Sequence, residues 1–321
     1  MLHFGGSGRI SFRIGSKGLS SLAFNAFGNP SEVLSSQPAA DLGAPGTGEV
    51  KVAMKSFPVV TEDIFTLKGI SFSRTSFGVA GSTGVGEISA VGAKVSSCKA
   101  SDSVFVVSDG LWSKDAIVPH SAVVKIPMLS AAEAAMVPAA VSAYAILNKF
   151  KSLQKGDTIA QLNSDSDIGQ AISQLGSVKG LKVVNVTLEA LSDPVTFTKN
   201  NGPIKYAISG TSGKPTNALM KTLSPGGALV SYSSSAYSTE EFGAVDVPIR
   251  AFIFSDVSMH GFSLSTFAKM ESETFNKAVE EVVPLIQSKK IKLTSTVFPM
   301  SQYSKAITAA EKGTGAVALE L

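Results

Sequence analysis

The chain has 321 residues, of which 44% are hydrophobic and 17% are charged, and its formal net charge is +3. This length predicts roughly two domains of ~150 residues, and the low charged fraction excludes a disordered chain. One cysteine, Cys98, and three widely spaced histidines exclude a disulfide framework and a cysteine- or histidine-built metal centre.

The N-terminal segment has a different composition from the rest of the chain. It carries Arg9, Arg13 and Lys17, is rich in serine and has no acidic residue before Glu32. This composition is typical of an organellar transit segment, and an ordinary basic arm is the alternative. We predict a mitochondrial protein whose residues 1–17 are a retained basic arm. The small net charge gives no reason to expect nucleic-acid binding. If the protein did bind nucleic acid, the basic arm would be the segment that makes the contact.

Residues from Gly18 to about Ile126 form short alternating runs broken by Gly and Ser. Such runs predict an antiparallel β region, a partly open barrel. The predicted strands are Leu19–Phe27, Glu49–Ser56, Val85–Val91, Ser103–Val107 and Val123–Ile126. An apolar helix, Ala131–Phe150, follows and is expected to be interrupted near Pro138. Because Glu133, Pro138 and Ser142 break its apolar run, we predict no membrane span.

The spacing of the apolar residues along the chain changes after residue 157. A strand, a helix and a second strand follow as a βαβ unit at Thr158–Leu162, Asp167–Lys179 and Leu181–Val186. Further strands are predicted at Tyr206–Ser209, Ala228–Tyr232 and Val257–Phe262, with a helix at Pro215–Leu223. This order of elements predicts a parallel sheet with covering helices.

The C-terminal part begins with one long amphipathic helix over Thr266–Ser288, with Pro284 near its end. A strand at Thr294–Phe298 and a helix at Ser301–Glu311 are predicted to close the chain.

The turn after the first parallel strand is where a nucleotide diphosphate would lie, on a helix N-terminus approached through glycines. It reads Asn163-Ser164-Asp165-Ser166-Asp167-Ile168-Gly169. Of the glycines expected in such a turn, only Gly169 is present, at the position that allows close packing of the helix on the strand. Two carboxylates facing a diphosphate would repel it. We interpret Asp165 and Asp167 as helix caps, with phosphate binding as the alternative.

The next determinant of a nucleotide site follows the second strand. A 2′-phosphate needs a basic side chain there, but the chain reads Leu188-Glu189-Ala190. Glu189 could accept ribose hydroxyls. Only about 18 residues lead to the next strand, too few for a full crossover, so the nucleotide domain is predicted to be shortened.

Taken in order, these motifs resemble the medium-chain dehydrogenase/reductase superfamily and, within it, the mitochondrial trans-2-enoyl-CoA (enoyl-thioester) reductases. The resemblance runs from about Gly18 to Leu321 and is carried by the following segments: Phe24–Pro30, Pro58–Gly69, Val79–Gly92, Gly110-Leu111-Trp112, Ser142-Ala143-Tyr144, Gly169-Gln170-Ala171, Ser212-Gly213-Lys214, Gly226-Gly227, Ser231-Tyr232 and Gly261-Phe262.

The resemblance implies an α/β fold without zinc. A GroES-like β-barrel domain would comprise residues 18–138 and 266–321. A shortened Rossmann-type domain, with a doubly wound parallel sheet, would comprise residues 139–265. A homodimer, which in this family forms by extending the nucleotide-domain sheet, would use the edge strand Val257–Phe262.

The functional positions of the family differ in this chain. Ser71 stands at the position of the catalytic tyrosine, and a serine hydroxyl is shorter and far less acidic than a phenol. The basic adenosine clamp corresponds to Leu188-Glu189-Ala190, and Tyr-Gly-Gly beside the nicotinamide corresponds to Tyr232-Ser233-Ser234. Residues that build the fold are kept, whereas residues that touch substrate or cofactor are not.

From this asymmetry we expect no catalytic residue, no metal and no cofactor. Asn163, Ser164, Gly169, Glu189 and Tyr232 are interpreted as a vestigial nucleotide site. The favoured hypothesis is a non-catalytic accessory subunit that binds other subunits of a mitochondrial assembly, a respiratory complex or mitoribosome.

Two alternatives remain. The chain could be an NADPH-dependent oxidoreductase of the 2-enoyl-thioester reductase type, or a sensor that binds an acyl or nucleotide fragment without turnover. The reductase hypothesis predicts an open cleft between the domains with a free amide at Gly169. The accessory-subunit hypothesis predicts a narrowed or blocked cleft.

Overall fold

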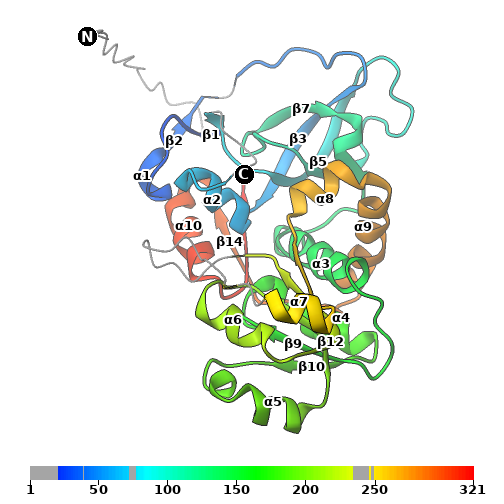
Figure 1. The fold of residues 1–321 in the computed structure, drawn as a ribbon. Coiled ribbons are helices and arrows are strands. Elements are labelled where there is room, and N and C mark those ends of the chain that lie inside the picture. Colours follow the sequence, from blue (N-terminus) through cyan, green and yellow to red (C-terminus); the bar gives the residue numbers. More distant parts are fainter. Residues whose placement is uncertain (1–20, 39, 72–76, 234–245, 247–248) are drawn as a thin grey trace, which may run out of the picture.

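The computed structural model describes residues 21–38, 40–71, 77–233, 246 and 249–321. The described strands form three sheets, of three, five and seven strands (Figure 1). The predicted basic arm, residues 1–17, lies outside the described residues.

Two of the sheets build the antiparallel half of the molecule. The small sheet contains β1 (Ser21–Phe24), β2 (Leu34–Gln37) and β4 (Gly78–Val79). The large sheet contains β3 (Glu49–Pro58), β5 (Thr83–Val91), β6 (Ser103–Val107), β7 (Asp115–Pro119), β8 (Val123–Lys125), β14 (Ser295–Pro299) and β15 (Ala316–Glu320). Strand β3 pairs antiparallel with β5, β7 and β15, as the alternating apolar pattern of a barrel-like region predicts.

The helices of this half are α1 (Pro30–Val33), α2 (Thr61–Lys68) and α10 (Tyr303–Lys312). Helix α2 begins where the Asp63 side chain accepts the Val60 N–H (3.0 Å) and ends at Gly69, whose φ is +75°. A Cβ at Gly69 would lie 2.8 Å from the Phe27 ring. Both the turn and the close approach therefore require glycine at this position.

The third sheet is parallel throughout, with the order β10 (Lys182–Asn185), β9 (Thr158–Leu162), β11 (Ile204–Ser209), β12 (Leu223–Ser231) and β13 (Ser258–Gly261). Strands β10 and β11 lie on opposite sides of β9, so the strand order reverses there. In open α/β sheets ligands bind at such a reversal, outside the carboxyl ends of the strands. The doubly wound dinucleotide-binding sheet has a further strand beyond the equivalent of β10; the described residues contain none, which agrees with the predicted shortening.

The helices around the parallel sheet are α4 (Asp167–Val178), α5 (Pro194–Asn201), α6 (Lys214–Met220) and α7 (Ile249–Ser255). The eight-residue α5 lies in the short connection between β10 and β11. Our prediction that this connection is too short for a helix–strand crossover is wrong, because a two-turn helix started by Pro194 and capped by Asp193 fits into it.

Helices α3 (Ala131–Lys149) and α9 (Ser272–Gln287) lie between the large antiparallel sheet and the parallel sheet (Figure 1). One hydrophobic core accordingly contains Phe105 of β6, Ile146 of α3 and Ile208 of β11. By length and composition alone, α3 is the one helix within the described ranges that could span a membrane; 72% of that window is buried inside the protein, so it is a core helix.

Two predictions on helices are wrong. Helix α3 runs without a break through Pro138, because it is packed on nearly all sides and the Ser142 hydroxyl donates to the Pro138 carbonyl (2.7 Å). The predicted helix 266–288 is two helices, α8 (Leu264–Met270) and α9, separated at Glu271 with φ −135° and ψ 51°.

The chain also continues after α10, where we predicted no further element. Gly313 and Gly315 turn it into β15, a short apolar run that pairs with both β3 and β14. This strand closes the C-terminal part onto the antiparallel sheet. The proposed domain boundaries, 18–138 with 266–321 and 139–265, stay a prediction.

Candidate functional site

A large cleft opens at the carboxyl ends of the parallel strands. Its volume is about 990 Å³, at the upper end of the ~300–1,000 Å³ range of small-molecule sites. The walls come from the start of α2 with the turn after it, the middle of α3, the first turn of α4, Tyr232 after β12, and the segment 262–266 that leads into α8. Both halves of the molecule thus contribute to one site.

Most of the lining side chains are apolar. They include Val60, Phe65, Ile70, Pro138, Phe262 and Leu264. The hydroxyls of Thr61, Ser71 and Thr266 also line the cleft, and Glu62 and Asp167 are the charged side chains among the described lining residues. Such a surface binds an apolar chain and offers a few hydrogen bonds to orient it.

The first turn of α4 is capped by Ser166. Its hydroxyl accepts the Gly169 N–H (3.0 Å) and donates to the Asn163 carbonyl (2.9 Å). Our assignment of the cap to Asp165 and Asp167 is therefore wrong. Asp165 is exposed, and the half-buried Asp167 accepts the N–H of the residue that follows it (2.7 Å). Burial raises the pKa of Asp167 to about 6.

Gly169 has the packing role that the sequence predicted. A Cβ there would lie 2.4 Å from the Asn163 carbonyl oxygen and 2.7 Å from the Ser164 Cα. The helix therefore approaches the loop more closely than any side chain allows. The Gly169 amide is bonded to Ser166, whereas the reductase hypothesis predicted it free; the open cleft is what that hypothesis predicted.

Tyr232 lies across the end of the sheet. Its hydroxyl is 3.0 Å from the Ser166 hydroxyl, and a Cβ at Gly210 would lie 2.3 Å from the Tyr232 oxygen. Desolvation by burial raises the pKa of the Tyr232 phenol well above its ordinary value. Of the five predicted loop residues, Asn163, Ser164, Gly169 and Tyr232 are thus brought together; Glu189 is exposed and does not line the cleft.

The segment before Ser71 carries a carboxylate that sequence reasoning missed. The Glu62 carboxylate, in the first turn of α2, accepts hydrogen bonds from the hydroxyls of Ser265 (2.5 Å) and Ser263 (3.5 Å) at the start of α8. These bonds join the two walls of the cleft. An acid in the first turn of one helix and a Ser-x-Ser at the start of another are common capping patterns, so nothing in the sequence indicates that these side chains pair.

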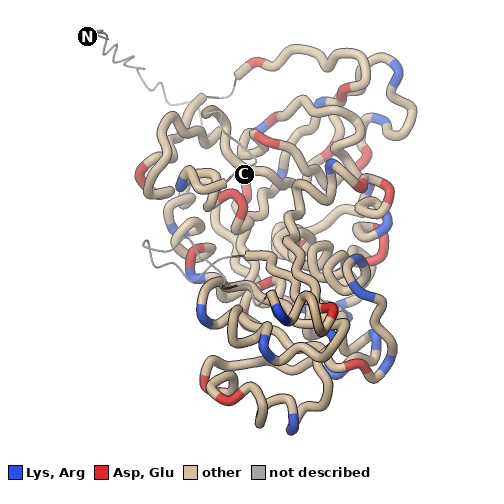
Figure 2. The backbone as a smooth tube through the Cα atoms, viewed as in Figure 1, with Lys and Arg blue, Asp and Glu red and all other residues tan. Residues whose placement is uncertain are grey.

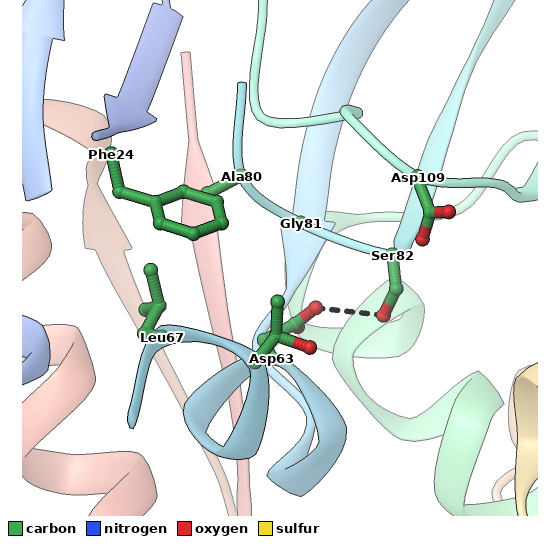
Figure 3. Close-up of a pocket in the computed structure, with 8 residues that line it drawn as sticks. Phe24, Asp63, Leu67, Ala80, Gly81, Ser82 and Asp109 are labelled. Atoms are coloured by element: carbon green, nitrogen blue, oxygen red, sulfur yellow. Dashed lines mark hydrogen bonds between the residues drawn. The ribbon is translucent and has the colours of Figure 1, made fainter. Parts of the chain in front are cut away.

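A second, small cavity lies behind α2 (Figure 3). Its volume is about 10 Å³, room for about one water molecule. Here the buried Asp63 carboxylate accepts hydrogen bonds from the Ser82 hydroxyl (2.7 Å) and the Val60 N–H. Burial raises the pKa of Asp63 to about 7, and the nearby Glu62 charge adds to that rise. Asp63 fixes the start of α2 and hence the position of the cleft wall.

The surface charge does not indicate a polyanion site. Figure 2 shows basic and acidic residues interspersed over the described parts of the chain, in keeping with the small net charge. Within the described ranges, no group of three or more His, Cys, Asp or Glu side chains is placed to hold a metal ion.

Comparison with known proteins agrees with this fold. No family model matches the chain. The mitochondrial enoyl-acyl-carrier-protein reductases of Mus musculus and Homo sapiens are 29% and 27% identical to it, each over 91% of this chain and 85% of the relative. Among solved structures, a mutant enoyl thioester reductase from Candida tropicalis superposes with a TM-score of 0.78 at 19% identity, covering 94% of this chain and 99% of that one.

A second solved structure, of a protein named for another activity, has the same fold. The quinone oxidoreductase of Pseudomonas syringae has a TM-score of 0.82 and 18% identity, covering 94% of this chain and all of that chain. A GroES-like domain joined to a Rossmann-type domain, with the cleft between them, defines the class of the fold. These matches confirm the resemblance to the medium-chain dehydrogenase/reductase superfamily and, within it, to the mitochondrial enoyl reductases.

These findings overturn the accessory-subunit hypothesis. The relatives that match nine-tenths of the chain are named as enzymes, and the cleft between the two halves is open, although Tyr232 crosses the crevice beside it. We inferred loss of function from changed motif positions, but at this level of identity individual positions change while the cleft they line persists. The predicted partner subunits of a larger assembly lose their basis with that hypothesis.

The mitochondrial location predicted from the N-terminal composition is confirmed by the same relatives, which are named as mitochondrial proteins.

Proposed function

We propose that the chain is an NADPH-dependent 2-enoyl-thioester reductase. The observation that carries the proposal is the open cleft of about 990 Å³ at the carboxyl ends of the parallel strands, walled by apolar side chains from both halves. Its volume and its apolar lining suit an extended acyl chain. The relatives, which match over most of their length, are named enoyl reductases, and this supports the same reaction.

The residues present allow a dinucleotide at the point where the strand order reverses. A Cβ at Gly261, at the end of β13, would meet nothing within 4 Å, whereas Gly210, after β11, is covered by the Tyr232 ring. The residues that would hold the cofactor are those of the Asn163–Gly169 loop and the ends of β11 to β13. When bound, the reduced nicotinamide supplies a hydride. The quinone oxidoreductase of Escherichia coli, another protein of this fold, was solved in complex with NADPH.

The chain's own residues bind and orient the substrate. Phe65, Ile70 and Phe262 cover the acyl chain and exclude water from it. The hydroxyls of Thr61 and Ser71 lie on the same wall and can donate hydrogen bonds to a thioester carbonyl, which lowers the energy of the enolate that forms. Because Ser71 is not a phenol, we assign it carbonyl binding rather than proton donation, and the proton that the enolate takes up at Cα comes from solvent water.

The proposal is tested with the purified protein, NADPH and trans-2-enoyl-CoA thioesters of short and medium chain length. Consumption of NADPH is followed at 340 nm, and the saturated thioester is identified by mass spectrometry. Stoichiometric appearance of the saturated product supports the proposal. Absence of turnover with every chain length, together with absence of NADPH binding by calorimetry, contradicts it.

We further propose that the reductase is a homodimer joined at β13. This strand is at the edge of the described parallel sheet, and the adjacent α7 exposes Ile253 and Phe254, which are 66% and 80% accessible. An open strand edge beside apolar side chains is typical of a surface that another chain covers. Light scattering after size exclusion is expected to give twice the monomer mass, and Phe254→Asp to reduce it; a wild-type monomer would contradict the dimer.

A further inference from the structure

The crevice at the reversal of strand order is crossed by side chains of the protein itself. It lies between the carboxyl ends of β9 and β11, the place where open α/β sheets bind their ligands. On the β9 side stands the loop from Asn163 to the first turn of α4. On the β11 side stands Gly210, directly after the strand.

Tyr232 spans this crevice. Its ring lies on Gly210, where an added Cβ would be 2.6 Å from the ring carbon that bears the hydroxyl. Its hydroxyl reaches the Ser166 hydroxyl on the other side (3.0 Å). The Asn163 amide crosses the same gap and donates to the Gly210 carbonyl (3.4 Å).

The helix end that would receive a diphosphate is occupied in the same way. Anions bind at the start of a helix because its first N–H groups lack partners. In α4 the Gly169 N–H is already bonded to the Ser166 hydroxyl, and that hydroxyl is bonded to Tyr232. The Tyr232 ring, its hydroxyl and the Ser166 cap of α4 are therefore connected and together cover the position of the diphosphate.

We infer that Tyr232 is the residue that sets the affinity for the dinucleotide, because it must leave the crevice before a diphosphate can enter. The inference rests on the proposed function. A protein that must first move to a binding-competent state has its apparent Kd raised by the reciprocal of the competent fraction. If one molecule in ten has Tyr232 displaced, removing the side chain tightens binding about tenfold.

The test measures Kd by calorimetry for NADPH and for ADP-ribose, which carries the diphosphate without the nicotinamide. Tyr232→Ala removes the cover, and Tyr232→Phe removes only the bond to Ser166. Tyr303→Phe is the matched control, because its hydroxyl donates to the Leu34 carbonyl (3.4 Å) in the antiparallel half. Thermal unfolding of each variant confirms that it is folded.

We expect Tyr232→Ala to bind both ligands about tenfold more tightly than wild type, Tyr232→Phe two- to fivefold more tightly, and Tyr303→Phe unchanged. Equal or weaker binding by both Tyr232 variants overturns the inference and leaves the proposed function standing. Absence of binding by wild type and every variant contradicts the proposed function itself.

A second measurement needs no folded Tyr232→Ala protein. Wild type labelled with 3-fluorotyrosine contains five fluorinated tyrosines, and the resonance missing in Tyr232→Phe is that of Tyr232. Saturation with ADP-ribose is expected to move that resonance toward the position of a solvent-exposed tyrosine. An unmoved Tyr232 resonance at saturation would show that the ligand enters without displacing it, contrary to the inference.

Discussion

The Glu62 carboxylate in α2 accepts a hydrogen bond from the Ser265 hydroxyl at the start of α8. Glu62 lines the cleft, and Ser265 lies between the lining residues Leu264 and Thr266, so the bond joins two segments of the cleft wall. The Ser263 hydroxyl donates to the same carboxylate oxygen (3.5 Å). This contact fixes the distance between the walls with side chains that carry no motif of the fold.

The first prediction concerns the strength of that contact. Hydrogen bonds to a charged partner contribute roughly 1.5–3 kcal/mol, and partial exposure reduces this, so we expect a coupling of about 1 kcal/mol between Glu62 and Ser265. The measurement is a double-mutant cycle of Glu62→Ala and Ser265→Ala in urea unfolding. Glu62→Gln, which keeps an acceptor oxygen, should lose less than Glu62→Ala. Additive single variants would show that the contact contributes nothing.

The second prediction is a pH dependence caused by Asp63. Burial raises its folded-state pKa from 3.8 to about 7, so the folded protein holds this proton more tightly than the unfolded chain does. The contribution of Asp63 to the free energy of unfolding is therefore largest below pH 3.8. It decreases as the pH rises and is lost above about pH 7. The loss is on the order of 4 kcal/mol, at about 1.4 kcal/mol for each pH unit.

Asp63→Asn isolates this effect, because the amide oxygen still accepts from Val60 or Ser82 and does not titrate. Urea unfolding between pH 5 and pH 8 should show a flatter slope for the variant, and higher stability than wild type at pH 8. The pKa of Asp167 is raised to about 6, so its contribution to stability is lost about one pH unit below that of Asp63. Measuring Asp167→Asn in the same way separates the effects of the two carboxyl groups. Parallel slopes for wild type and Asp63→Asn would exclude Asp63 as the cause.

The third prediction follows from the contact between Gly210 and Tyr232. Gly210 has no left-handed φ, and the three atoms nearest to an added Cβ all belong to Tyr232, so we expect the effect of Gly210→Ala to come from this clash. Overpacking of this kind destabilises by about 1–3 kcal/mol. In a Tyr232→Ala background the clash is absent, and Gly210→Ala should cost less than about 0.5 kcal/mol. An equal loss in both backgrounds would show that some other contact makes Gly210 necessary.

The elements that were predicted correctly are those with regularly spaced apolar residues and a clear turn or capping residue at their ends. Thr158–Leu162 is a short apolar run before a polar turn, and it is the buried interior strand β9. The helix from Asp167 was likewise evident from its apolar spacing. The interruption expected at Pro138 failed because tertiary packing on every side of α3 outweighs the one backbone bond that proline removes.

The site was less predictable because its contacts join residues far apart in the chain. Tyr232 and Ser166 are neighbours only because β9, β11 and β12 lie side by side, and no local pattern expresses that. The cap of α4 was assigned to aspartates by residue type, although Ser166 has the position from which its hydroxyl reaches the Gly169 N–H. The accessory-subunit hypothesis failed for a related reason, since motif positions alone do not reveal whether a cleft is open.

The last prediction concerns Ser71 and rests on the proposed reductase activity. Ser71 follows the turn that ends α2, where its N–H donates to the Phe65 carbonyl (3.2 Å), and it lines a cleft with room for a larger side chain. A positioned phenol can donate a proton in the transition state, and general acid catalysis contributes roughly 10²–10⁴-fold. Ser71→Tyr should therefore raise kcat by at least about tenfold, since the new phenol is not held by evolved partners.

Ser71→Phe is the matched control, because it fills the same space without a hydroxyl. The measurement is steady-state reduction of one enoyl thioester by NADPH, with kcat and KM determined for wild type, Ser71→Tyr, Ser71→Phe and Ser71→Ala. We expect Ser71→Ala to lower kcat/KM a few-fold, through loss of one hydrogen bond to the thioester carbonyl, at about 1 kcal/mol. A rise in kcat shared by Ser71→Tyr and Ser71→Phe would trace the gain to packing rather than to the phenol, and an unchanged Ser71→Ala would remove Ser71 from carbonyl binding.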